Sequence, residues 1–373
     1  MAMNMPALKI GKHEPRYPLI QGGMGAIVSG TNLAGHVAAC GGVGTIASVG
    51  LSVNSPLFKQ IGYFEANRIV MREAARQAKE IAEKNRNPMF GNSKPVIAVN
   101  CMVALTDYET QVRSSCEGGA DIIISGAGLP LRLPEYTKDF PHVGLLPIVS
   151  SAKAASLVAR RWEKQYGRIP DGFVAVTPHA SGGHCGVGTI EQVYAPEFAL
   201  DVIVPEVVRY VAEELKIDIP VIAAGGIWDR SDIERVFELG AKGVQMGTRF
   251  VCTEECDADK RYKQAFMDAT ADDVVIINSP VGLPARVIRS PFVSAYLEGK
   301  VENKPCFANC LSHCRHMKDR STFCIAMALV EACRGNWESG LFFCGANVVK
   351  AVKMETVEQV MLDLFPDSGE VEG

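Results

Sequence analysis

A histidine lies in a glycine-rich stretch, Ser181-Gly-Gly-His184-Cys185-Gly186, which follows an apolar run of the sequence. An unperturbed imidazole has a pKa of about 6.5, so it can accept or donate a proton near neutral pH. The flanking glycines leave room for a cofactor ring or a substrate. We therefore predict that His184 is a catalytic acid or base. The alternative is an ordinary histidine of a surface loop; His179 is a weaker candidate, and Cys185 has no base mapped beside it.

Four of the chain's 12 cysteines are concentrated in one short segment, at Cys306, Cys310, Cys314 and Cys324. Four thiolates can hold either Zn²⁺ or a [4Fe–4S] cluster. Zinc sites usually combine one close pair of cysteines with a second, distant pair, whereas here three cysteines follow one another at intervals of four. This spacing favours an iron–sulfur cluster.

Glycine-rich turns end several apolar runs: Gly22-Gly23-Met24-Gly25, Ser125-Gly-Ala-Gly128, Gly225-Gly226 and Gly247-Thr248. The last two turns follow the seventh and eighth runs, where α/β barrels commonly bind phosphate through loop amides and a helix N-terminus. The next helix is predicted to begin near Asp229, so that its N-terminus faces the anion. The alternative is that these are only tight turns, but two at this pair of strands favour phosphate binding.

The common nucleotide-binding motifs are missing. Val28 stands where a dinucleotide fingerprint needs its third glycine, and the Gly-Lys pairs at 11–12 and 299–300 are not followed by serine or threonine. A Walker P-loop is therefore excluded, and a Rossmann-type NAD site is disfavoured. A mononucleotide held by its phosphate suits the turns better.

The elements that must position these residues alternate between short apolar runs and helical patterns. Eight runs are apolar nearly throughout, as strands covered on both faces should be: 17–21, 43–48, 95–100, 120–125, 143–150, 172–176, 219–224 and 243–246. Helical patterns lie between most of them, at 31–40, 107–116, 152–165, 205–215 and 229–239. Eight βα units predict an α/β fold, a closed (β/α)8 TIM barrel.

Two stretches do not fit the repeat. Residues 50–94 are predicted to be an inserted helical segment near the barrel mouth. Residues after about 252 continue past the eighth strand, so the chain divides into a cofactor-binding barrel, 1–252, and a C-terminal cysteine-cluster extension, 253–373. The cluster segment spans about 302–326 of that extension.

The composition is that of a globular protein. The chain has 373 residues, of which 47% are hydrophobic and 21% charged, and its net charge is −4. There is no basic surplus to attract nucleic acid or an anionic membrane, and no apolar run approaches the ~18 residues of a membrane span. The N-terminus lacks the apolar core of a signal peptide, so we expect a cytoplasmic protein in which the cysteines are thiols or metal ligands.

Several motifs together resemble the nitronate monooxygenase (2-nitropropane dioxygenase) and enoyl-ACP reductase II family of FMN-dependent barrels. They are Gln21-Gly-Gly-Met-Gly25, Ser181-Gly-Gly-His184, Ala223-Ala-Gly-Gly-Ile227 and Gly243-Val-Gln-Met-Gly-Thr-Arg-Phe250. Further segments are similar to an iron–sulfur branch that includes the bifunctional acyl-ACP dehydrogenase/isomerase of unsaturated fatty-acid synthesis: Ser150-Ser-Ala-Lys153, Asp229-Arg230, Pro280-Val-Gly-Leu-Pro-Ala-Arg286, the four cysteines, Phe323-Cys-Ile325 and Gly340-Leu-Phe-Phe-Cys-Gly-Ala-Asn347.

This resemblance implies a role for each matching residue. His184 would be the acid or base, and the four cysteines would carry a [4Fe–4S] cluster. The implied FMN contacts are Gly22, Gly23, Met24, Asn100, Lys153, Gly183, Gly225, Gly226, Gln245, Gly247 and Thr248. The glycine pairs and Thr248 would hold the phosphate, and Lys153 would lie near the electron-rich edge of the flavin.

The activity implied by the resemblance is dehydrogenation of acyl-ACP thioesters, with accompanying isomerisation left open. The substrate partner is then an acyl-carrier-protein-bound or small-molecule acyl group, and the electron acceptor is oxygen or a redox protein. Nitronate oxidation and NAD(P)H-dependent enoyl-ACP reduction are the rival reactions, and an electron carrier is a non-catalytic alternative. An acyl-length apolar tunnel beside the flavin would favour fatty-acid chemistry, whereas a small closed pocket would favour nitronates. A homodimer is left open.

Overall fold

Eight parallel strands close into a barrel in the computed structural model, which describes residues 5–301, 305–306, 308–319 and 322–366. The strands are β1 (Leu19–Gln21), β2 (Val43–Ala47), β3 (Val96–Met102), β4 (Ile122–Gly126), β5 (Gly144–Val149), β6 (Phe173–Val176), β8 (Val221–Ala224) and β9 (Gly243–Met246). Ile20 of β1 pairs with Gln245 of β9 and closes the ring. The predicted (β/α)8 fold is confirmed, and each of the eight apolar runs overlaps one barrel strand.

The interior of the barrel is filled by branched apolar side chains, among them Ile20, Ile122, Val174 and Ile222. Ile10, from the N-terminal segment, belongs to the same cluster. This filling makes the barrel a packed core rather than a pore. Any ligand site must therefore lie at one end of it.

Helices surround the barrel: α1 (Thr31–Ala39), α3 (Tyr63–Lys84), α4 (Tyr108–Glu117), α5 (Leu133–Thr137), α6 (Ala152–Tyr166), α7 (Leu200–Arg209) and α8 (Arg230–Glu238). The helix predicted at 205–215 begins earlier, at Leu200, and continues through a π-helical turn over Tyr210–Leu215. Proline usually stands at the start of a helix. In α7 the helix begins before the proline, because Ile203 and Val204 already belong to its buried face. Pro205 therefore lies inside α7.

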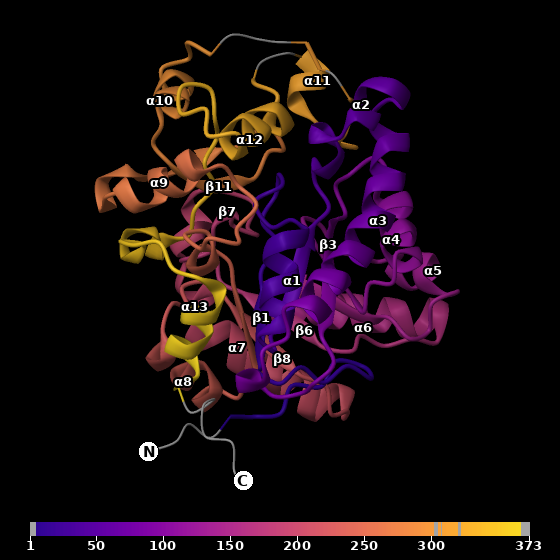
Figure 1. Ribbon diagram of the computed structural model, residues 1–373. Coiled ribbons are helices and arrows are strands. Elements are labelled where there is room, and N and C mark those ends of the chain that lie inside the picture. Colours follow the sequence, from indigo (N-terminus) through magenta and orange to yellow (C-terminus); the bar gives the residue numbers. More distant parts are fainter. Residues whose placement is uncertain (1–4, 302–304, 307, 320–321, 367–373) are drawn as a thin grey trace.

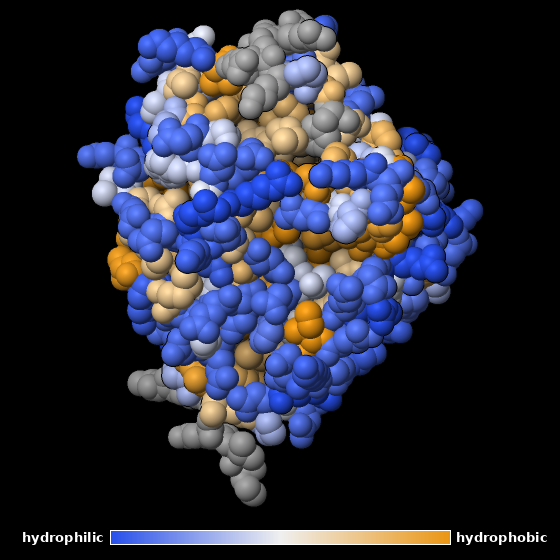
Figure 2. Space-filling view, turned by 45° about the horizontal axis from the view of Figure 1, so that its top comes forward, coloured by the Kyte–Doolittle hydropathy of each residue, from blue (hydrophilic) through white to orange (hydrophobic). Residues whose placement is uncertain are grey.

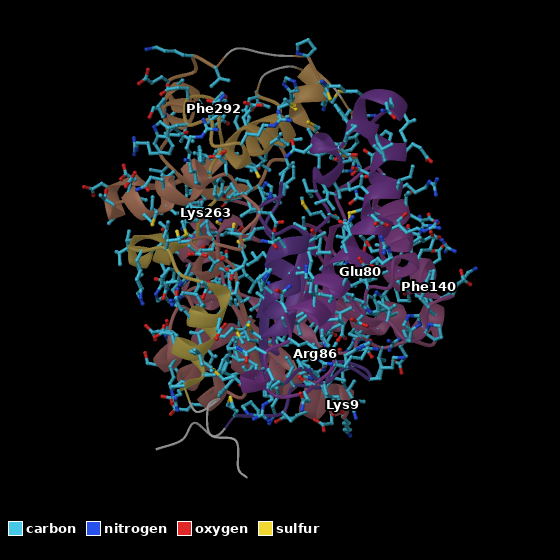
Figure 3. All side chains as sticks on the ribbon, viewed as in Figure 1. Lys9, Glu80, Arg86, Phe140, Lys263 and Phe292 are labelled. Carbon is cyan, nitrogen blue, oxygen red and sulfur yellow. The ribbon has the colours of Figure 1, made fainter. Side chains whose placement is uncertain are left out.

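About half of the predicted insertion at 50–94 is α3, a barrel helix whose alanine-rich face is buried in one core with residues of α1 and α4. Its outer face is charged, and Figure 3 shows Glu80 on this helix and Arg86 just beyond it. The additional residues at the mouth are the short helices η1 (Leu51–Asn54) and α2 (Pro56–Ile61). The helical turn η2 (Pro88–Phe90) follows α3. The polar outer face of α3 is the reason why residues 50–94 read as one added segment in the sequence.

The C-terminal extension adds α9 (Lys260–Asp268), α10 (Pro291–Leu297), α11 (Arg315–Asp319), α12 (Ile325–Cys333), α13 (Val357–Leu364) and the turns η7 (Ala271–Asp273) and η8 (Ala346–Lys350). It also supplies β10 (Val274–Asn278) and β11 (Pro284–Ile288), which form a second sheet with β7 (Gly183–His184) in the order β10-β11-β7. Figure 1 shows α10, α11 and α12 at the same end of the molecule as α2, whereas α8 and the C-terminal end of α13 lie toward the opposite end.

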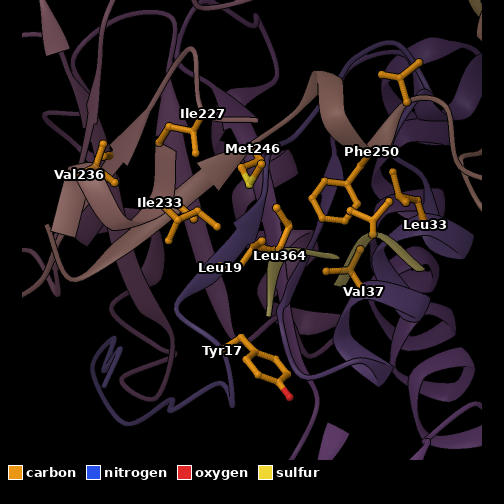
Figure 4. Close-up of a cluster of buried hydrophobic side chains, with 14 of the residues drawn as sticks. Tyr17, Leu19, Leu33, Val37, Ile227, Ile233, Val236, Met246, Phe250 and Leu364 are labelled. Carbon is orange, nitrogen blue, oxygen red and sulfur yellow. The ribbon is translucent and has the colours of Figure 1, made fainter. Parts of the chain in front are cut away.

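The extension shares the hydrophobic core of the barrel. Leu364 of α13 lies in one cluster with Leu19 of β1 and Phe250, as Figure 4 shows. The ring of Phe365 stacks on that of Tyr17, with 4.8 Å between centroids. The described residues before and after the predicted boundary, between residues 252 and 253, therefore pack into one core. No helix in the described part of the chain is both long and apolar enough to cross a membrane.

Candidate functional site

A cavity of about 750 Å³ opens at the carboxyl ends of the barrel strands. Figure 2 shows hydrophobic side chains gathered around a hollow on the face turned toward the viewer. The cavity lining includes these predicted site residues: Gly22, Gly23, Met24, Asn100, Gly183, His184, Gly225, Gly226, Gln245, Gly247 and Thr248. Lys153 lies on the exposed first turn of α6 and is not among the lining residues, although Ser150 and Ala154 are. Its role at the flavin stays a prediction.

The side of the cavity nearest the barrel consists mainly of backbone. Gly225 has a φ of +96°, and a Cβ there would lie 2.9 Å from the carbonyl oxygen of Thr177. Only glycine accommodates both the dihedral angle and the close approach. In the part of the chain that the structure describes, the amides of Gly225, Gly226 and Gly247 donate no hydrogen bond to protein. These N–H groups are available to an anion at the cavity edge.

Two buried side-chain oxygens in the cavity wall also have no hydrogen-bond partner among the described residues, Gln245 Oε1 and Ser181 Oγ. A buried polar atom without a partner is costly, so such atoms often mark the position of a ligand. The amide oxygen matches the ring N–H of a flavin, and the free loop amides match its phosphate. The glycine-lined side therefore fits FMN.

The expected anion contact with the N-terminus of α8 is not supported. Asp229 caps this helix, and its side chain accepts a hydrogen bond from the Asp232 amide at 3.1 Å. Asp232 in turn accepts one from the Trp228 amide at 2.9 Å. Two carboxylates therefore already occupy the positive end of the helix dipole. The free loop amides are the better anion donors.

His184 lies in β7, which pairs with β11 through Ala285. Its Nε2 atom lies 3.0 Å from the buried Ser279 Oγ, and its ring contacts Phe343 edge-on at 5.3 Å between centroids. Burial lowers the pKa of His184 from its ordinary value to about 4. The imidazole is therefore neutral at physiological pH, so one of its ring nitrogens carries a lone pair instead of a proton. The sequence predicted a loop here, because a two-residue strand paired with a distant partner has no periodic signal of its own.

Arg286 of β11 is almost completely buried and holds the segment that leads to His184. Its guanidinium donates hydrogen bonds to the backbone oxygens of Pro178 at 3.2 Å, His179 at 3.0 Å and Ser181. It also lies over the ring of Tyr194. In the sequence, Arg286 stands out only as part of a family-like motif without a role of its own, because nothing local shows which carbonyls it contacts.

The other side of the cavity is formed by apolar side chains. Leu105, Leu311, Ile325 and Leu329 are all buried and line it. Leu311 is held there because the 310–312 segment pairs with the loop after β3: the Thr106 amide donates to the Cys310 oxygen at 3.0 Å. The extension thus completes the cavity that the barrel begins.

The four predicted cluster cysteines lie near one another but do not form a metal site in the structure. Within the described residues, no group of three or more histidine, cysteine, aspartate or glutamate side chains is arranged to hold a metal ion. Burial, together with the neighbouring Cys324, Cys306 and Cys314, raises the pKa of Cys310 to about 12. The residues present do not fit a [4Fe–4S] cluster as they stand, so the structure does not support that prediction.

Comparison with known proteins gives consistent matches. A family model described as nitronate monooxygenase matches residues 7–367. A probable nitronate monooxygenase of Staphylococcus saprophyticus is 28% identical over 293 residues, which cover 74% of this chain and 77% of that protein. The (3aS,4S,5R,7aS)-5-hydroxy-7a-methyl-1-oxo-octahydro-1H-indene-4-carboxyl-CoA dehydrogenase of Mycobacterium tuberculosis is 26% identical over 283 residues, 76% of this chain and 66% of that protein. The solved structure of FabK from Thermotoga maritima has a TM-score of 0.68 at 25% identity and covers 95% of this chain and 93% of FabK.

Proposed function

The chain belongs to the nitronate monooxygenase family and is a flavin-dependent oxidoreductase, and from this premise we propose that it uses FMN to dehydrogenate an acyl thioester carried by acyl carrier protein. The observation that carries the proposal is the apolar side of the cavity. A nitronate has only a few heavy atoms, whereas the cavity of about 750 Å³, which FMN would share, continues beyond the glycine loops to α12.

The apolar wall suits an acyl chain. Burying each methylene of a chain contributes about 0.8 kcal/mol, and Leu311, Ile325 and Leu329 offer a surface of that kind. The relative from Mycobacterium tuberculosis, named as the dehydrogenase of a carboxyl-CoA compound, supports a thioester substrate.

The chain's own residues supply orientation and proton transfer. Bound FMN supplies the acceptor for the hydride that leaves the β-carbon. His184 removes the α-proton, for which its low pKa provides a neutral ring. When Nε2 donates its hydrogen bond to Ser279, the lone pair of Nδ1 is left to accept that proton. The Cα–Cβ bond thereby becomes a double bond, and no step is assigned to the cysteines.

Nitronate oxidation is the second candidate, because the family model and the staphylococcal relative both carry that description. A nitronate has already lost its α-proton, so its oxidation needs no proton removal by His184, unlike the dehydrogenation of an acyl thioester. The two reactions differ in the part of the cavity they use: a nitronate needs only the region beside His184, whereas an acyl chain needs the apolar wall.

The test is an anaerobic titration of the flavin-loaded protein. We expect a medium-chain saturated acyl-ACP to bleach the visible band of the oxidised flavin and to yield an enoyl thioester. An alkyl nitronate forms the second arm, and acyl-ACP added to the His184→Ala variant forms the control. Bleaching by the nitronate alone, with FMN confirmed present, would overturn the acyl proposal in favour of the second candidate.

A further inference from the structure

A short C-terminal segment, residues 344–350, connects three loops that border the cavity. We call it the strap. The Gly345 amide donates to Thr248 Oγ1 at 2.9 Å, and the Ala346 amide donates to the Ala180 oxygen at 3.1 Å. Asn347 Nδ2 donates to the Gly226 oxygen at 2.8 Å. The strap therefore contacts the loops that follow β6, β8 and β9.

The strap lies too close to these loops for a larger residue at its centre. A Cβ on Gly345 would lie 2.8 Å from Thr248 Oγ1 and 3.2 Å from the Ala180 oxygen. Farther along, Lys350 Nζ lies 3.6 Å from the Asp229 carboxylate, at the end of the loop that contains Gly226. The contacts of the strap thus concentrate on the region where the phosphate is expected.

The hydrogen bonds from the strap determine which groups remain free for a ligand. A threonine hydroxyl has one hydrogen to donate. Because Thr248 Oγ1 accepts the Gly345 N–H, its own hydrogen can point to an oxygen in the cavity. The Gly226 oxygen belongs to the same planar peptide unit as the Ile227 N–H. Asn347 holds that oxygen and therefore directs the Ile227 N–H to the opposite side.

We propose that Asn347 is a positioning residue for the phosphate of FMN, acting through the Gly226–Ile227 peptide unit rather than by touching the flavin ring. This inference rests on the FMN part of the proposed function. It assigns a role in cofactor binding to a residue more than a hundred positions away from the loop it orients. The ligand feature it serves is a phosphate monoester, so the effect of changing Asn347 should disappear when the phosphate is absent.

The experiment compares FMN with riboflavin, which lacks the phosphate, by fluorescence titration of the full chain freed of flavin. Loss of one hydrogen bond of ordinary strength should raise the Kd for FMN about fivefold in Asn347→Ala. The Kd for riboflavin should stay unchanged. Asn347→Asp should weaken FMN binding further, because a carboxylate cannot donate to the Gly226 oxygen and repels the phosphate.

The matched control is Asn336→Ala, which removes an amide of the same extension that donates to Glu331 at 3.0 Å and does not line the cavity. Equal FMN binding by Asn347→Ala and the wild-type chain would overturn the inference alone. An equal loss of FMN and riboflavin binding would also overturn it, because Asn347 would then support the site as a whole. A wild-type chain that binds no FMN would overturn both this inference and the proposed function.

Discussion

The two sides of the cavity are built from different kinds of group. On the barrel side the wall is mostly backbone, with glycine turns such as Gly225-Gly226 and amides that face the ligand. On the extension side the wall consists of side chains, with Leu311 and Leu329 around the apolar end and His184 held by β11. The backbone side suits a cofactor, because amides bind phosphate whatever the neighbouring side chains are. On the other side, substitution of the wall residues alone can change which substrate fits.

Removing the imidazole tests whether chemistry belongs to the extension side. We expect His184→Ala to lower the rate of flavin reduction by about 10²- to 10⁴-fold, the usual contribution of a general base. FMN content should be unchanged, since the glycine loops remain intact. Single-turnover absorbance measures the rate. His179→Ala is the control, because its Nε2 bonds to the Ala195 oxygen away from the cavity lining; an equal loss there would contradict the assignment.

Arg286 tests how the extension holds the catalytic segment. Arg286→Met leaves buried carbonyl oxygens without their donors, and we expect a loss of about 3 kcal/mol in the free energy of unfolding. The rate of flavin reduction should fall as well, because the segment before His184 loses its support. Urea denaturation measures the stability. Arg289→Met, at an exposed position, should change it by less than about 0.5 kcal/mol. A similar free energy of unfolding for both variants would mean that the hydrogen bonds of Arg286 do not stabilise the segment before His184.

The apolar wall itself is tested by filling it. Leu329→Trp should lower kcat/KM for a medium-chain acyl thioester about tenfold, because hydrophobic pockets discriminate by shape to that extent. The Kd for FMN should change less than the acyl kinetics, since the free amides of Gly225, Gly226 and Gly247 are left as they are. The exposed Leu157→Trp is the matched control. An unchanged kcat/KM in Leu329→Trp would show that the acyl chain of the substrate does not bind against Leu329.

The pH dependence gives the smallest effect. The folded-state pKa of His184 is lowered to about 4 by burial, and the neutral form is the base, so kcat/KM should be constant from pH 8 to pH 5 and halve near pH 4. The unfolded chain binds this proton near pH 6.5. The contribution of His184 to stability is thus complete above pH 6.5 and is lost as the pH falls toward 4. A profile of kcat/KM with its acidic limb at pH 6.5 would show that the ring is solvated.

Sequence reasoning succeeded where the signal is local. The barrel strands are short, apolar on both faces and separated by helical patterns, so all eight were found. The glycine turns and His184 were placed at the cavity because the carboxyl ends of parallel strands meet at one end of a barrel. Other patterns reached less far. The polar stretch 50–94 gave no sign that α3 within it packs as a barrel helix, and the cysteine spacing predicts a cluster that the described residues do not support.

The sequence alone determined the barrel, its glycine-lined end and the type of side chain available for proton transfer, because each follows from periodicity and spacing over a few residues. Only the tertiary structure decided what those groups can do. His184 and Ser279 are 95 positions apart, and Asn347 and Gly226 are 121 apart. No local pattern encodes such a contact, since it exists only when the extension folds onto the barrel. The burial that lowers the pKa of His184, the orientation of the loop peptides and the apolar wall all arise from that packing.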